Sequence, residues 1–157
     1  MENENVNINK EHVILKVKFI DKDGNVISEE TKEHDLVVNS GLALRAQLLG
    51  GVSTPTALNA IAVGTGTTAP SATQTALVSE VARVASTNSL VTTNVTNDTL
   101  QMVGTISFTA SYTIAEVGTF NSTTANSGTM YSRDTVGPYN VTSGTSLQFT
   151  FQFVQTS

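Results

Sequence analysis

Hydrophobic and polar positions alternate along much of the chain, which is typical of β-strands with one buried face. In residues 13–20 the side chains of Val13, Leu15, Val17 and Phe19 share one face, and Lys16 and Lys18 lie on the other. Residues 147–154 repeat the pattern with four large side chains on one face, Leu147, Phe149, Phe151 and Phe153. Asp21-Lys-Asp-Gly24 supplies turn residues before Val26–Thr31, so we expect a hairpin there.

Further strands are expected through the rest of the chain. Their predicted positions are near 58–63, 81–87, 90–96, 99–110, 112–120 and 129–135. The turn markers between them are Asn97-Asp98, Asn121 to Gly128, Gly137-Pro138 and Ser143-Gly144. Short strands at this spacing predict an all-β fold, mainly an antiparallel sandwich or a barrel-like domain.

One segment follows a helical pattern instead. Asn39 and Ser40 are capping residues, Leu44 and Leu48 lie one turn apart, and Gly50-Gly51 forms a C-terminal stop. This predicts one short α-helix near residues 40–49.

The length of 157 residues fits a single domain. We expect an N-terminal arm over residues 1–11 and one β-rich domain over 12–157. Within that domain we distinguish a charged β-hairpin (12–35) from a Thr-rich body (36–157).

Charge is distributed unevenly between these parts. Residues 1–35 hold five lysines and nine acids, 14 of the 21 charged residues. Residues 46–157 hold six, namely Glu80, Arg83, Asp98, Glu116, Arg133 and Asp134. Because a monomer normally presents many charges to water, we expect the body to pack against other subunits in a homo-oligomer, for which a trimer is one candidate. The alternative is a secreted, Thr-rich β-domain, but the N-terminus has no basic and apolar regions of a signal peptide.

Composition excludes several classes of function. The chain has no cysteine, so disulfides, thiolate metal sites and thiol catalysis are excluded. A net charge of -5 argues against binding nucleic acid, which requires a basic face. No stretch of about 20 apolar residues is present to span a membrane.

The sequence offers little for catalysis or metal binding. His12 and His34 both lie in the charged hairpin and lack a well-placed third ligand. No histidine follows position 34 to activate a serine, and the acids of the body are more simply explained as ion-pair partners or, for Asp98, as a turn residue. Gly64-Thr-Gly-Thr-Thr-Ala69 matches a dinucleotide-binding pattern, but Pro70 follows where a helix should begin. We therefore expect no enzyme and no catalytic, cofactor-binding or metal-binding residue.

The sparse charges of the body are candidates for interface or structural ion pairs. In an unbroken strand Glu80 and Arg83 lie on opposite faces, so each needs another partner. We expect Arg83 or Arg133 to meet Glu116, within one subunit or across a subunit boundary.

Several segments, taken in order, resemble small virion structural proteins of tailed bacteriophages, of the head-decoration or tail-fibre-associated type. They are Asn39-Ser-Gly-Leu-Ala43, Ala60 to Ser71, Thr75 to Arg83, Ile114 to Asn121, Gly128 to Arg133 and Ser143 to Phe153. The resemblance covers roughly residues 36–155 and carries over no catalytic residues.

This resemblance implies a non-enzymatic virion protein, assembled in the host cytoplasm and bound to the major capsid protein or other virion proteins. A single short domain with an arm favours a capsid decoration, or cement, protein. The alternative within this class is a tail, baseplate or tail-fibre component. A different alternative is a carbohydrate- or host-surface-binding β-module, which requires a concave site with exposed Tyr112, Tyr131 or Tyr139.

Overall fold

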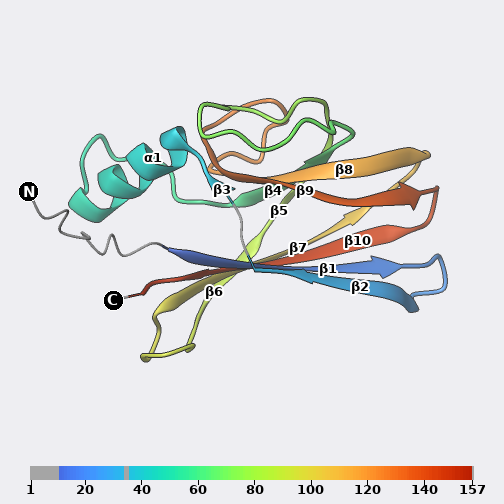
Figure 1. Ribbon diagram of the computed structural model, residues 1–157, viewed down its shortest axis with the longest axis horizontal. Coiled ribbons are helices and arrows are strands. Elements are labelled where there is room, and N and C mark those ends of the chain that lie inside the picture. The colour runs from blue at the N-terminus through green and yellow to red at the C-terminus, as the bar shows by residue number, and fades with distance from the viewer. Residues whose placement is uncertain (1–10, 34–35, 157) are drawn as a thin grey trace, which may run out of the picture.

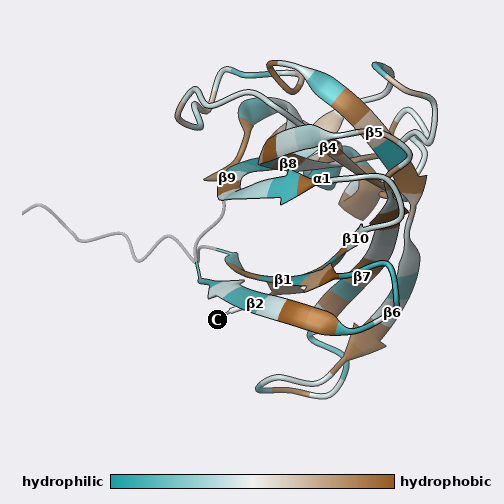
Figure 2. Cartoon of the chain, turned by 90° about the vertical axis from the view of Figure 1, so that its right-hand side faces the viewer, coloured by the Kyte–Doolittle hydropathy of each residue, from teal (hydrophilic) through white to brown (hydrophobic). Residues whose placement is uncertain are grey.

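The strands pair into two antiparallel sheets of five strands that pack face to face (Figures 1 and 2). The computed structural model describes residues 11–33 and 36–156. Sheet A holds, in spatial order, β2 (Val26–Lys32), β1 (His12–Ile20), β10 (Ser146–Val154), β7 (Thr99–Ser107) and β6 (Thr87–Val91). Sheet B holds β3 (Leu36–Val37), β9 (Met130–Val141), β8 (Tyr112–Phe120), β4 (Ala60–Gly64) and β5 (Glu80–Ala85). The described residues contain one helix, α1 (Asn39–Gly50), so the predicted all-β sandwich with a short helix is confirmed.

The core lies between the sheets, where the alternation predicted it. The inward side chains of β10 and of its neighbour β1 are almost completely buried. They are Leu147, Phe149, Phe151, Phe153, Val13, Leu15 and Val17. Sheet B contributes Ile61, Val63, Ile114 and Val117 to the same cluster. Full burial of each large side chain stabilises the fold by about 1.5–3 kcal/mol. The charged hairpin is part of this core, because β1 pairs along its whole length with β10.

Helix α1 ends as predicted but begins differently. The N–H groups of Gly51 and Val52 donate to the carbonyl oxygens of Leu48 and Gln47, and Gly51 takes the left-handed conformation at φ 61°. The N-cap residue is Val38, which makes no side-chain capping hydrogen bond. The hydroxyl of Ser40 instead donates to the carbonyl oxygen of Met130 on β9. The predicted capping role of Asn39-Ser40 is therefore wrong, because Ser40 attaches the helix to sheet B.

Gly137-Pro138 does not end a strand, so that predicted turn is wrong. Strand β9 continues through it to Val141, and the register with β8 slips between Ile114 and Glu116. Two additional residues of β9 are accommodated there as a bulge, with Gly137 at φ 62°. Two other expectations also differ from the structure: β6 ends at Val91 instead of residue 96, and the two-residue β3 was not predicted.

Candidate functional site

The candidate ion-pair residues all lie on the outer face of sheet B. Cross-strand pairing aligns Arg83 with Ala62, Ala62 with Gly118, and Gly118 with Arg133. The segments 65–79 and 121–129 lie above this face (Figure 1). A small apolar cluster fills the space beside the charges, made of Val38, Ala60, Ala62, Leu77, Phe120 and Met130. The outer face of sheet B is therefore covered by the chain's own loops.

Glu116 and Arg133 form a completely buried ion pair within one subunit. Oε2 of Glu116 lies 2.9 Å from Nε and 2.8 Å from Nη2 of Arg133, and both side chains are 0% exposed. Backbone N–H groups of Gly66, Val78 and Ser79 also donate to this carboxylate, at 3.1, 2.9 and 2.7 Å. Of the two arginines considered for Glu116, Arg133 is the one that contacts it.

These donors keep the Glu116 carboxylate charged. Burial alone would raise the pKa of Glu116, but the N–H groups of Ser79 and Val78 and the guanidinium of Arg133 outweigh burial and lower the pKa below its ordinary value. A carboxylate in this setting stays ionised at neutral pH and acts as an acceptor for the groups around it.

The same ion pair attaches residues 65–79 to the sheet. Nη1 of Arg133 donates to the carbonyl oxygen of Thr68 at 2.9 Å and to Oε1 of Gln74 at 3.2 Å. An added Cβ at Gly64 or Gly66 would lie 2.4 or 2.6 Å from Oε1 of Glu116. The glycines of the dinucleotide-like pattern are thus explained by the close approach of this internal carboxylate.

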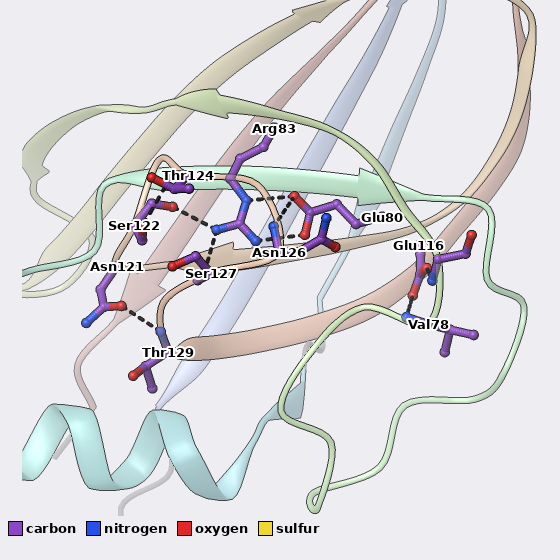
Figure 3. A network of polar contacts seen from close by, with 11 residues as sticks. Val78, Glu80, Arg83, Glu116, Asn121, Ser122, Thr124, Asn126, Ser127 and Thr129 are labelled. Atoms are coloured by element: carbon purple, nitrogen blue, oxygen red, sulfur yellow. Dashed lines mark hydrogen bonds and ion pairs between the residues drawn. The ribbon is translucent and has the colours of Figure 1, made fainter.

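Arg83 pairs with Glu80, contrary to the expectation that each needs another partner (Figure 3). Nε and Nη2 of Arg83 donate to the two carboxylate oxygens of Glu80, each at 2.8 Å. The register of β5 against β4 shifts between Val63 and Gly64, so Glu80 and Arg83 lie on the same face. Our expectation was wrong because it assumed an unbroken strand, and a bulge reverses the alternation of side chains.

The Glu80–Arg83 pair holds the second covering segment, residues 121–129. Nη1 of Arg83 donates to the carbonyl oxygens of Ser122 and Ser127 at 2.8 and 2.7 Å (Figure 3). The guanidinium lies 3.9 Å from the ring centroid of Phe120, which adds a cation–π contact. Each ion pair therefore anchors one loop over sheet B.

The remaining two charged residues of the range 46–157, Asp98 and Asp134, have local roles as well. Asp134 is buried and lies 3.3 Å from Nζ of Lys32 on β2, an ion pair between the two sheets that sequence reasoning missed. Asp98 accepts hydrogen bonds from the backbone N–H groups of Val95, Thr93 and Asn94, and these lower its pKa. Residues 46–156 thus take five of their six charged side chains into the interior: Glu80, Arg83, Glu116, Arg133 and Asp134.

Two grooves open on the surface near the tyrosines. One, of about 420 Å³, runs between α1 and the end of sheet A, with an apolar lining that includes Leu48 and Leu49. The other, of about 380 Å³, lies beside the β9 bulge. Tyr131 and Tyr139 are buried and donate to Glu11 and Glu30, and burial together with these carboxylates raises the pKa of both tyrosines. Only Tyr112 is exposed, at 38%, so Tyr131 and Tyr139 do not provide the exposed stacking surface that the carbohydrate-binding alternative requires.

The other sequence candidates give no further site. His12 begins β1, and His34 and the arm residues 1–10 lie outside the described residues. Within 11–33 and 36–156, no three His, Asp or Glu side chains gather to hold a metal ion. No helix in that part of the chain has the length and hydropathy needed to cross a membrane.

Comparison of the chain with models of known protein families, with curated proteins and with solved structures finds no match in any of the three.

Proposed function

We propose that this protein is a non-enzymatic structural component of a tailed-bacteriophage virion, and that it decorates the capsid through subunit–subunit contacts. The scarcity of charge on the surface of residues 46–156 carries this proposal. Five of the six charged side chains in that range are buried and anchor the chain's own segments. A protein that works alone in water normally keeps such side chains outside, whereas a surface that contacts other subunits does not require them.

The uncharged surface is continuous across neighbouring strands. Strands β10, β7 and β6 lie side by side in sheet A and contain no charged residue. Large apolar side chains are also exposed along the body: Leu42, Leu48, Leu49, Val52, Val78, Leu90 and Val95. Hydroxyl, amide and apolar side chains of this kind lose little on desolvation when they meet a complementary surface. Repetition of a modest contact over a symmetric shell would make the binding strong.

The ordered series of segments that resembles virion proteins supports the phage assignment. The partners on this proposal are the major capsid protein or other virion proteins, together with further copies of this chain. A tail, baseplate or tail-fibre location is the alternative within the same class, because the same uncharged surface would serve there.

Electron cryomicroscopy of particles with and without the gene tests the proposal. We expect the deletion to remove density at many equivalent positions on the head. Loss of density from the tail would favour the alternative. Particles that never contain the protein would overturn the virion role altogether.

A further inference from the structure

The sandwich has four edge strands, and three of them are protected against pairing with another chain. Unpaired backbone groups on an edge strand can accept a further strand unless charge, irregularity or shortness prevents it. Strand β2 carries Glu29, Glu30 and Lys32, and its register against β1 is irregular at Phe19/Ile20. Strand β3 has only two residues. Strand β5 contains the bulge and the Glu80–Arg83 pair.

The fourth edge, β6, has none of these protections. Its five residues, Thr87–Val91, include no charge and no proline, and four of the five are exposed. It pairs with β7 on one side, and no strand of the described chain lies on its other side. Leu90 is 61% exposed on this strand. An exposed apolar side chain on an open edge is the situation in which strands of separate chains pair.

We infer that β6 pairs antiparallel with β6 of a second copy of this chain, which joins two copies of sheet A into one continuous sheet. This inference rests on the proposed function, since it identifies one of the subunit–subunit contacts. The two strands are identical and uncharged, so a two-fold arrangement brings no like charges together. Pairing of β6 with the β2 edge would instead place Glu29 and Glu30 against a surface that has no cation to neutralise them.

The length of β6 fixes the register. Two five-residue strands overlap completely only when Ser89 lies opposite its own copy on the two-fold axis. Thr87 then lies opposite Val91, and Asn88 opposite Leu90. This places the exposed Leu90 beside a neighbouring side chain and satisfies the backbone groups along the free edge.

A single cysteine at the axis tests this arrangement directly, because the natural chain has none. Directly opposite residues in an antiparallel pair have Cα atoms about 4.5–5.5 Å apart, within the range that a disulfide bridges. We expect Ser89→Cys to form a covalent dimer under mild oxidation. The matched control is Ser28→Cys, at a position that is also exposed, on the protected edge β2.

Ser89→Cys should cross-link about tenfold faster than Ser28→Cys or more, because a preformed pair raises the effective thiol concentration. Equal rates for the two variants would overturn the inference. Cross-linking of Ser89→Cys in a protein that never joins a particle would instead reject the virion role and leave β6 pairing intact.

A charge at the same position provides a second measurement. Ser89→Lys places two ammonium groups opposite each other on the axis, so we expect sedimentation velocity to show a shift from dimer towards monomer. Ser28→Lys should leave the distribution unchanged. Self-association that is the same in both lysine variants, with native circular dichroism spectra, would show that the subunits meet elsewhere.

Discussion

Replacement of Glu116 by Gln should strongly destabilise the protein, and the size of the effect follows from its contacts. The amide can keep one oxygen for the N–H groups of Gly66 and Ser79, but it no longer accepts from Val78 and Arg133. Arg133 is then a buried charge without its anionic partner, which costs about 3–5 kcal/mol. The orphaned N–H of Val78 adds about 1 kcal/mol. Since a domain is stable by only about 5–15 kcal/mol, this variant should be close to unfolding.

Removal of both charges should be less harmful than the single changes suggest. In the double variant Glu116→Gln/Arg133→Met, no unpaired charge remains, so we expect a loss of about 1–3 kcal/mol from the orphaned hydrogen-bonding groups. Arg133→Met alone leaves Glu116 with three backbone donors and should cost about 2–3 kcal/mol. The double variant should therefore be more stable than Glu116→Gln.

Urea unfolding of the natural protein, the two single variants and the double variant, followed by circular dichroism, measures these differences in stability. Lys18→Gln is the control, because the Lys18–Glu29 pair is 44% and 62% exposed at 3.6 Å and should contribute less than about 1 kcal/mol. A double variant that loses as much as the sum of the two single variants would show that Glu116 and Arg133 do not interact energetically. That result would refute the assignment of this pair as the anchor of the covering loop.

Three further changes test other parts of the structure. Because the pKa of Glu116 is lowered on folding, the ionised side chain contributes fully to the free energy of unfolding above its ordinary pKa of 4.5. This contribution is lost as the pH falls through the lowered pKa. Urea titrations from about pH 5 to pH 2 should therefore show a steeper loss of stability for the natural protein than for Glu116→Gln. Gly41→Ala should destabilise by several kcal/mol because the new Cβ would lie 2.1 Å from a carbonyl oxygen of β9, whereas Gly50→Ala meets only a side chain at 3.3 Å, and thermal unfolding compares them. Arg83→Met should speed hydrogen exchange in residues 121–129 relative to the natural protein and leave exchange in the core strands unchanged. Unchanged exchange in residues 121–129 would mean that the loop is held by other contacts.

The parts of the fold that were predictable are those set by local pattern. The alternation in β1 and β10 identifies both strands and their buried faces, and Gly51 identifies the end of α1. The errors arise where the sequence allows a choice that only long-range pairing decides. Gly137-Pro138 is compatible with a turn or with a bulge, and β8 pairs with β9 on both sides of it, which makes it a bulge.

The candidate site follows the same division. The small number of charged residues in the body indicated that Glu116 would have an arginine partner. The choice of Arg133 depends on the alignment of Gly118 with Arg133 between β8 and β9. The Glu80–Arg83 pair was missed because a bulge cannot be identified from an alternating pattern alone. For the Glu116 site, the sequence offered one signal, the glycines at 64 and 66, which mark a close approach of the backbone to the Glu116 carboxylate.

The position of the charges also predicts how self-association responds to salt. The spatial order of sheet A places the charged β2 at one edge and β6 at the other, four strand spacings away. At about 4.8 Å per spacing these edges lie roughly 19 Å apart, about two Debye lengths at physiological ionic strength. Repulsion from the charges of β2 should therefore be largely screened at the β6 edge.

Dimer formation through β6 should then change little between about 0.15 M and 0.5 M NaCl, because β6 itself carries no charge and the charges of β2 lie farther away than the Debye length. Hydrogen bonds between the backbones and burial of Leu90 would provide the association energy, and neither involves a net charge. Sedimentation equilibrium at the two salt concentrations measures the dissociation constant. A strong salt dependence would place the charged hairpin, rather than β6, at the contact between subunits.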